Sequence, residues 1–170
     1  IHEQYRYFTI DEYQDISPLQ QRLIDAWLGN RNEMCVVGDP AQTIYSFAGA
    51  SPTYLLGFTN RFPEAEVIRL TTGYRSTPEI LFTANALVRS ARIGYELSPV
   101  NEHGSRPELT QYNTEGQEAI GVTNMITELI SNGESAANIA VLARTNSQLA
   151  SFERAFKSAA LPYQIRTNER

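Results

Sequence analysis

The sequence predicts an α/β protein built on parallel β-sheet, and two observations carry that prediction. Short apolar runs rich in β-forming residues alternate along the 170 residues with longer segments whose apolar residues recur at helical spacing. This alternation is typical of parallel sheets, because a helix returns the chain to the starting edge before each new strand. Hydrophobic residues make up 42% and charged residues 19%, which is enough apolar surface to bury a core and argues against a disordered chain.

The first expected elements are a strand, a helix and a second strand. Residues 7–10 (Tyr-Phe-Thr-Ile) form a short apolar run that predicts the first strand. The helix should begin at Ser17, which can cap it together with Gln20 in a capping box. Apolar residues then recur at helical spacing up to Gly29, which can end the helix. The unbroken apolar run 34–37 predicts a buried parallel strand.

The rest of the chain repeats this scheme. The segment Ser76–Glu79 is typical of a helix start, and turn-forming residues predict a loop over 92–107. The elements expected in this part are strands at 67–70, 109–112, 139–143 and 163–166, and helices at 76–91, 114–132 and 149–159. A loop at residues 62–65 precedes the series, so we expect residues 1–64 and 65–170 to belong to different domains.

Composition excludes several classes of protein. The single cysteine, Cys35, cannot form an internal disulfide or a multi-cysteine zinc site, and its place in an apolar run predicts that it is buried in the core. No apolar run approaches the roughly 18 residues of a membrane span. The N-terminus has no secretory signal, so we expect a cytoplasmic protein without membrane contact. His2 and His103 have no ligand-like neighbours in the sequence and are assigned no role.

The charge balance limits how the chain could bind nucleic acid. There are 14 Lys and Arg against 19 Asp and Glu, which gives a net charge of −5 and a pI near 5.1. This balance counts against a strongly basic binding surface. It still allows a single strand to be held by aromatic stacking in a small groove.

Polar side chains follow three of the predicted strands. Asp11 and Glu12 come directly after the first strand, Asp39 and Gln42 follow the second, and Arg75 lies between the third strand and the next helix. Ligands of open parallel sheets bind at the carboxyl ends of the strands. If the first two strands run parallel, the four residues that follow them share one edge of the sheet.

This combination of residues suits phosphate transfer. One carboxylate can hold Mg²⁺, and the next can orient and deprotonate the attacking water. An amide and a guanidinium can contact the transferred phosphate, and the planar fork of Arg matches phosphate oxygens well. Each residue alone has a simpler explanation, because an acidic pair after a strand is often a solvated turn and a single Arg often forms a surface ion pair. The ordered set favours the catalytic interpretation.

Four segments resemble, in order and spacing, motifs of the superfamily 1 DNA helicases of the UvrD/Rep/PcrA type. They are 8–15 (FTIDEYQD, like the Walker B segment), 36–50 (VVGDPAQTIYSFAGA), 73–77 (GYRST) and 139–148 (IAVLARTNSQ). The resemblance covers nearly the whole chain. It implies RecA-like domains of the P-loop NTPase type, with residues 1–64 as the C-terminal part of the first and 65–170 as the N-terminal part of the second.

The resemblance also implies roles for individual residues. ATP and Mg²⁺ would be the cofactors, with Asp11 binding the metal, Glu12 activating water and Gln42 sensing the γ-phosphate. Arg75 would be an arginine finger donated by the second domain. The partners would be single-stranded DNA and its junctions with duplex, unwound from 3′ to 5′. The DNA-contacting residues would be Tyr45 and Phe47 against bases, and Arg144, Thr145 and Asn146 against the backbone. For the two aromatic residues the alternative is ordinary core packing.

The sequence departs from the family pattern at several positions. Ala48 stands where the family usually has Arg, Pro40-Ala41 replace a commoner acidic pair, and residues 71–73 (TTG) replace Glu-Gln-Asn. A Gly-x-x-x-x-Gly-Lys-Ser/Thr phosphate loop and the family's final arginine motif do not occur in these 170 residues. By resemblance the remaining helicase domains of a longer parent chain would supply them. We therefore expect the 170 residues alone not to hydrolyse ATP.

Three other functions stay open at this point. The chain could belong to the helicase subunit of an AddA/RecB-type helicase–nuclease, whose members share the Asp-Pro pair seen at Asp39-Pro40. It could be a non-catalytic nucleic-acid-binding or regulatory module, although the intact set of Asp11, Glu12, Gln42 and Arg75 argues against this. It could also be an unrelated small α/β nucleotide-binding protein, which would need a phosphate site of its own.

Overall fold

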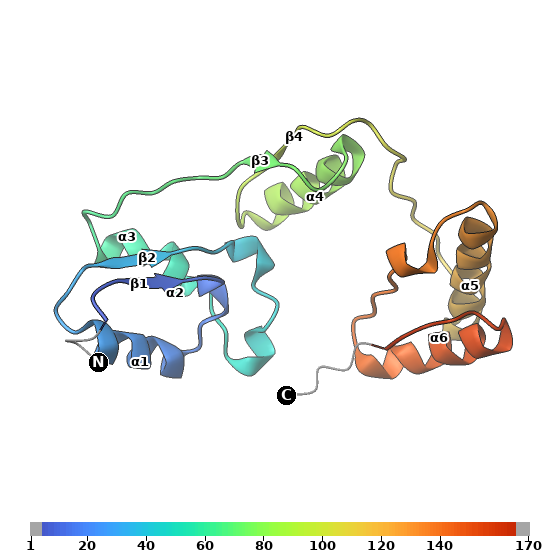
Figure 1. The fold of residues 1–170 in the computed structure, drawn as a ribbon, viewed down its shortest axis with the longest axis horizontal. Helices are drawn as coiled ribbons and strands as arrows, with labels where there is room; N and C mark the ends of the chain where they lie inside the picture. The colour runs from blue at the N-terminus through green and yellow to red at the C-terminus, as the bar shows by residue number, and fades with distance from the viewer. Residues whose placement is uncertain (1–4, 166–170) are drawn as a thin grey trace. The chain divides into compact units, whose positions relative to one another are not determined.

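The computed structural model describes residues 5–165 and confirms an α/β protein with short parallel sheets (Figure 1). The chain divides into two compact units, one up to Pro107 and one from Glu108 onward. The predicted domain boundary between residues 64 and 65 falls inside the first of these units. The assignment of two RecA-like domains therefore stays a prediction.

The first unit opens with the expected strand, helix and strand. β1 (Phe8–Ile10) pairs in parallel with β2 (Met34–Val36). α1 (Pro18–Leu28) connects them, and Ser17 caps it through the predicted capping box. Gly29 ends α1 with a φ of 63°, a value that glycine adopts without steric cost. The parallel pairing brings the carboxyl ends of both strands to the same edge.

Hydrogen bonds continue this pairing past the ends of the strands. Ile10 lies opposite Val36 in the register. The Val37 N–H donates to the carbonyl of Ile10 at 2.8 Å, and the Tyr13 N–H donates to the carbonyl of Val37 at 2.9 Å. Tyr13 is buried, with its ring edge-on to Phe58 at a centroid distance of 6.0 Å. The loops after β1 and β2 are therefore held against one another.

Short helical turns make up most of the chain between β2 and residue 62. They are α2 (Thr53–Leu56) and α3 (Phe58–Arg61), together with the 3₁₀ turns η2 (Pro40–Gln42) and η3 (Ser46–Ala48), while a further 3₁₀ turn, η1 (Tyr13–Asp15), lies between β1 and α1. α2 contacts η1, the turn that follows β1. The sequence pattern did not predict α2 and α3.

The later part of the first unit contains a second parallel pair. β3 (Thr72–Gly73) pairs with β4 (Ser98–Pro99), and α4 (Pro78–Ala91) connects them. The Asn85 amide on α4 donates to the carbonyl of Leu97 at 2.9 Å and accepts from the Leu97 N–H at 3.0 Å. These bonds fasten the segment before β4 to the helix. β4 itself corrects the prediction that 92–107 is loop throughout.

The second unit is a pair of helices with a small core. α5 (Glu115–Ser131) packs against α6 (Asn146–Ser158), and the 3₁₀ turn η4 (Ala136–Asn138) lies between them in the sequence. The core consists of Ala119, Phe152 and Phe156. α5 agrees with the predicted helix, and α6 begins earlier than predicted. In the described part of the chain, no helix is long and apolar enough to cross a membrane.

Four predicted strands are wrong. Among the described residues, the segments 67–70, 109–112, 139–143 and 163–165 belong to no sheet, and residue 166 lies outside the described residues. Several of their apolar side chains are exposed, such as Leu70 (83% exposed) and Leu142 (92% exposed), while Val141 packs against the core of the second unit without joining a sheet. A β-forming composition favours an extended backbone, but a strand exists only where a neighbouring chain supplies partners for its N–H and C=O groups.

Cys35 is another correction, because its side chain is exposed and not part of the core. Successive side chains of a strand point to opposite faces. In β2, Met34 and Val36 are half-buried on one face, so Cys35 between them points to the other. An unbroken apolar run therefore does not prove that both faces of a strand are covered.

A carboxylate at the start of α4 anchors the chain that follows β4. Glu79 Oε2 accepts the Gly104 N–H at 2.9 Å, and Glu79 Oε1 lies 2.6 Å from Nδ1 of His103. His103 thus has a partner that the sequence did not indicate, while His2 lies outside the described residues. The Gly104 N–H, and after it His103, lower the pKa of Glu79 from 4.5 to about 2.

We predict that Glu79→Gln removes a pH-dependent part of the free energy of unfolding. A lowered native pKa stabilises the fold above the unfolded value of 4.5, and this gain disappears as the pH falls from 4.5 towards 2. The stability difference between wild type and E79Q should therefore be largest above pH 5 and shrink at lower pH. Urea titrations of both proteins between pH 3 and pH 6, in steps of about half a pH unit, measure this stability difference.

His103→Ala should retain most of this pH dependence, because the Gly104 N–H is the larger cause. A stability difference for E79Q that stays constant across the pH range would contradict the assignment.

Candidate functional site

Two carboxylates lie at a sharp bend directly after β1. Asp11 and Glu12 are both exposed. Glu12 has φ 51° and ψ 42°, the left-handed region that residues other than glycine seldom adopt, and its N–H donates to Asp11 Oδ1 at 2.9 Å. Such backbone conformations concentrate at functional sites. The bend places both side chains at the carboxyl end of the strand.

A second polar cluster lies on the loop after β2. Asp39 caps η2, with its Oδ1 accepting the Ala41 N–H at 2.9 Å. Its Oδ2 accepts from Nε2 of Gln42 at 3.0 Å. Pro40, the first residue of η2, is buried. The Gln42 amide is thus held by Asp39 at the edge of the sheet.

Gln14 joins the two clusters. Its Nε2 donates to Glu12 Oε2 at 2.6 Å, and its Oε1 accepts the Asp39 N–H at 3.0 Å. The result is one hydrogen-bonded chain that runs from Glu12 through Gln14 and Asp39 to Gln42. The structure therefore brings together the side chains that were expected to share an edge, and Asp11 lies beside them.

Sequence reasoning gave Gln14 no role. The signal was present in the segment Asp-Glu-Tyr-Gln-Asp (11–15), where a Gln sits two residues after a candidate catalytic acid. That spacing alone does not show that the amide turns inward, and a Gln in a loop is usually solvated. Its partners, the Glu12 carboxylate and the Asp39 N–H, come together only in the folded chain.

Arg75 lies on the exposed loop between β3 and α4. Nδ2 of Asn101 donates to the carbonyls of Tyr74 at 2.9 Å and Ser76 at 3.3 Å, on either side of Arg75. The backbone of the loop is held by these bonds, and Arg75 itself is exposed. No ion pair or hydrogen bond joins Arg75 to Glu12 or Gln42 among the residues that the structure describes.

Tyr45 and Phe47 lie on the loop that continues from Gln42. Phe47 is 84% exposed and Tyr45 43% exposed, with ring centroids 6.1 Å apart. An aromatic ring of that exposure is not packed in a core, so core packing does not explain Phe47. Gly49 ends this turn with a φ of 91°. The two rings form an exposed apolar surface a few residues from Gln42.

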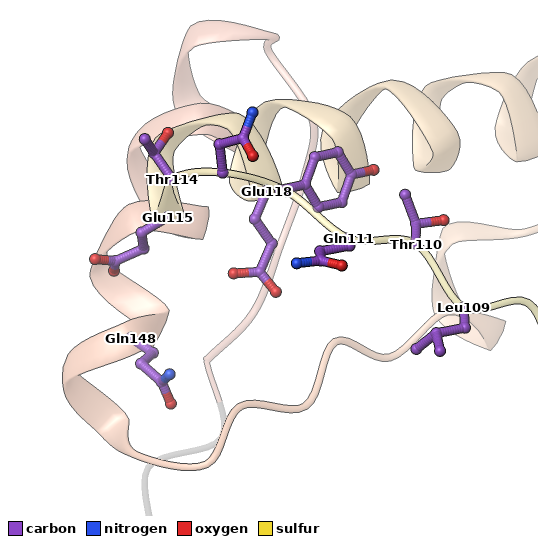
Figure 2. A pocket seen from close by; sticks show the side chains of 9 residues that line it. Leu109, Thr110, Gln111, Thr114, Glu115, Glu118 and Gln148 are labelled. Atoms are coloured by element: carbon purple, nitrogen blue, oxygen red, sulfur yellow. The ribbon is translucent and has the colours of Figure 1, made fainter.

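Arg144, Thr145 and Asn146 lie in the second unit, exposed at the start of α6. The Thr145 N–H donates to Oε1 of Gln148 at 3.0 Å, which fixes the entry into the helix. Gln148 also lines a groove of about 540 Å³ between residues 109–115 and the starts of α5 and α6 (Figure 2). Two carboxylates line this groove, Glu115 and Glu118. They disfavour a polyanion inside it.

Comparison with known protein families agrees with this arrangement. Residues 1–63 match the family model described as UvrD/REP helicase N-terminal domain. Residues 68–170 match the model described as UvrD-like helicase C-terminal domain, which is more than half of the chain. The chain belongs to the UvrD-like helicase family. The resemblance seen in the motifs is thereby confirmed at the level of the family.

Several curated UvrD-like relatives match almost all of this chain. ATP-dependent DNA helicase UvrD2 of Mycobacterium tuberculosis is 44% identical over 98% of the chain and 25% of its own length. Putative ATP-dependent DNA helicase YjcD of Bacillus subtilis is 35% identical over 95% of the chain and 22% of its own length. DNA helicase II of Escherichia coli is 36% identical over 96% of the chain and 23% of its own length. The chain thus spans about a quarter of the length of these relatives.

The residues of this UvrD-like chain fit a magnesium ion of the kind that accompanies a nucleotide. Within the described residues, no group of three or more His, Cys, Asp or Glu could hold a metal ion by itself. Mg²⁺ usually keeps several waters and is bound by one or two carboxylates plus substrate phosphates. Asp11 offers such a carboxylate, exposed at the strand end and oriented by the Glu12 N–H.

Gly38 has no Cβ and so leaves room for the amide of Gln14. We predict that Gly38→Ala destabilises the protein. A Cβ at this position would lie 2.6 Å from Gln14 Oε1, 3.0 Å from Leu55 Cδ2 and 3.2 Å from the Tyr13 N. Overpacking of this kind costs about 1–3 kcal/mol of unfolding free energy, which urea titration measures.

Gly116→Ala is the matched control, because no heavy atom lies within 4 Å of a Cβ there and the residue is in α5. It should leave stability unchanged or raise it by up to about 1 kcal/mol. If G38A is as stable as wild type, the amide of Gln14 is not packed as described.

Proposed function

We propose that this chain works, within a longer protein, as part of an ATP-dependent DNA helicase that couples ATP hydrolysis to movement along single-stranded DNA and to duplex unwinding. The direction, 3′ to 5′, follows from the resemblance. The observation that carries the proposal is the hydrogen-bonded chain from Glu12 through Gln14 and Asp39 to Gln42. It joins a candidate hydrolytic residue to the loop that leads to exposed aromatic side chains.

In this proposal each polar side chain at the strand edge has one task in hydrolysis. Asp11 holds Mg²⁺, which when bound neutralises the charge of the phosphate oxygens. Glu12 orients the attacking water and accepts its proton. Gln42 donates its amide to the γ-phosphate, and Arg75 stabilises the charge that develops on it. The geometry at Glu12 supports this, because its Oε2 is already fixed by a hydrogen bond.

In this proposal, exposed aromatic rings and the polar residues at the start of α6 form the DNA-contacting surface. The rings of Tyr45 and Phe47 stack on bases, which suits a motor because stacking tolerates any sequence. Arg144, Thr145 and Asn146 bind the backbone. Ala48 removes one positive charge that relatives of this type commonly carry, so stacking supplies a larger share of the affinity here. The acidic net charge of −5 agrees with this emphasis.

We assign residues 1–64 to the first RecA-like domain and residues 65–170 to the second, with Arg75 reaching the nucleotide from the second. The partners are single-stranded DNA, its junctions with duplex, and the remaining domains of the parent chain. Those domains supply the phosphate loop, since the 170 residues contain no Gly-x-x-x-x-Gly-Lys-Ser/Thr sequence.

In the parent protein, Glu12→Gln should abolish ATP hydrolysis and spare nucleotide binding. The amide cannot accept the proton of the attacking water, while the groups that grip the nucleotide stay in place. Steady-state turnover with single-stranded DNA and binding of a fluorescent nucleotide measure the two effects. Unchanged turnover would remove Glu12 from its catalytic role.

Arg75→Ala should slow hydrolysis in the parent protein without unfolding it, because Arg75 is exposed and only its backbone loop is held. Removal of an arginine finger costs a factor of about 10³–10⁵ in kcat in well-studied cases. Turnover together with a melting curve tests this, and a folded variant with normal kcat would contradict it.

Phe47→Ala should weaken the affinity of the parent protein for single-stranded DNA by about 1–3 kcal/mol, the value of one stacked base. Phe82→Ala is the matched control, because Phe82 is also well exposed (72%) but lies on α4. Fluorescence titrations at one fixed salt concentration compare the two. Equal affinities of F47A and F82A would exclude base stacking by Phe47.

A further inference from the structure

The amide of Gln14 is the most completely constrained polar side chain at the proposed site. The residue is 1% exposed. Both ends of its amide are bonded, the nitrogen to Glu12 Oε2 at 2.6 Å and the oxygen to the Asp39 N–H at 3.0 Å. A buried amide with both ends paired costs nothing in unsatisfied hydrogen bonds and has a single preferred position.

The orientation of this amide is fixed by its partners. A backbone N–H only donates, so the atom that faces Asp39 must be the oxygen. A carboxylate accepts, so the atom that faces Glu12 must be the nitrogen. Rotating the amide by half a turn would place its NH₂ group against the Asp39 N–H, donor against donor. It would also place its oxygen against the Glu12 carboxylate, acceptor against acceptor. Gln14 is therefore a connector with a defined direction.

The side chain is also packed closely against the loop after β2. The backbone of Gly38 lies so close to the Gln14 oxygen that a Cβ there would come within 2.6 Å of it. The backbone on both sides is held as well, by the Tyr13 N–H on the carbonyl of Val37 and the Asp15 N–H on the carbonyl of Glu12, each at 2.9 Å.

We infer that Gln14 is a positioning residue that holds the Glu12 carboxylate in place for hydrolysis and links it to the backbone of the Asp39 loop. Gln14 does not touch the reacting atoms and acts through Glu12. The inference rests on the proposed function. It adds to that function a connection from the Asp39 loop to Glu12. A shift of Asp39 moves the Gln14 amide, and the amide moves the Glu12 carboxylate that it holds.

The same link reaches the exposed aromatic residues. Asp39 holds Gln42, and the chain continues from Gln42 to Tyr45 and Phe47. A change at that loop when DNA is bound thus has a mechanical connection to Glu12. Loss of the connector should uncouple hydrolysis from DNA while nucleotide binding remains.

The test uses two variants of the parent protein. Gln14→Leu removes both hydrogen bonds at similar volume. Gln14→Glu keeps the acceptor for the Asp39 N–H but replaces the donor with a carboxylate that repels Glu12. Both should lower kcat by about 10-fold to 100-fold, the effect of losing a hydrogen bond to a charged group. The dissociation constant for nucleotide should change by less than about threefold, because only the positioning of Glu12 is altered.

Stimulation by DNA is the second measurement. The ratio of kcat with single-stranded DNA to kcat without it should fall towards 1 in Q14L. A purely structural role would instead lower the melting temperature and leave this ratio unchanged. If Q14L does not fold, Q14E decides the question by the same two readouts.

Gln21→Leu is the matched control. Gln21 is also buried (4% exposed) and also has both amide ends bonded, to the Tyr13 hydroxyl at 2.7 Å and to Asp25 Oδ1 at 2.6 Å, but it has no bond to Glu12 or Asp39. Q21L should lose stability and keep its kcat and its DNA stimulation.

The outcomes separate this inference from the proposed function. If E12Q abolishes turnover while folded Q14L or Q14E keeps wild-type kcat and DNA stimulation, the inference is wrong and the function stands. If Q21L lowers kcat as much as Q14L, the loss is general and the inference is also wrong. If wild-type parent protein has no ATPase activity, or E12Q keeps it, the proposed function fails and the role of Gln14 fails with it.

Discussion

The parallel pairing of β1 with β2 is the constraint on which the candidate site depends. Parallel strands end at the same edge of a sheet, so the residues that follow them meet there whatever the rest of the chain does. The bonds from Val37 to Ile10 and from Tyr13 to Val37 continue the pairing past the ends of both strands. Acidic residues from one loop and an amide from the other are thereby brought to one edge, where we propose that they face a phosphate.

The buried amide of Gln14 then fixes the positions of the side chains at this edge. An unpaired buried amide would cost about 1–3 kcal/mol, so a sequence that buries one must satisfy both of its ends. Gln14 does so with a candidate catalytic carboxylate and with the backbone of the neighbouring loop. The same two bonds that make the burial affordable fix Glu12 relative to Gln42. Stability and the geometry of the site therefore have one source in this part of the fold.

The sequence predicted the long helices α1, α4, α5 and α6, the first two strands and the shared edge, because helix starts such as the cap at Ser17 and apolar spacing are local signals. It failed where structure depends on distant partners. The segments 67–70 and 139–143 have β-forming composition but no neighbouring backbone to pair with among the described residues, and Cys35 faces the uncovered side of β2. Gln14 was missed for a related reason, since its burial goes with a hydrogen-bond partner on the loop after β2, 25 residues away in the sequence.

The most direct test of this account is a crystal structure of the parent protein with ADP, Mg²⁺ and aluminium fluoride, which mimics the transferred phosphate. We expect Glu12 and Gln42 both to face the fluoride group, Asp11 to lie on the metal side, and the Gln14 amide to stay at about 3 Å from Glu12, within hydrogen-bond distance. A nucleotide bound away from this edge, or Glu12 and Gln42 turned to opposite sides of it, would contradict the account.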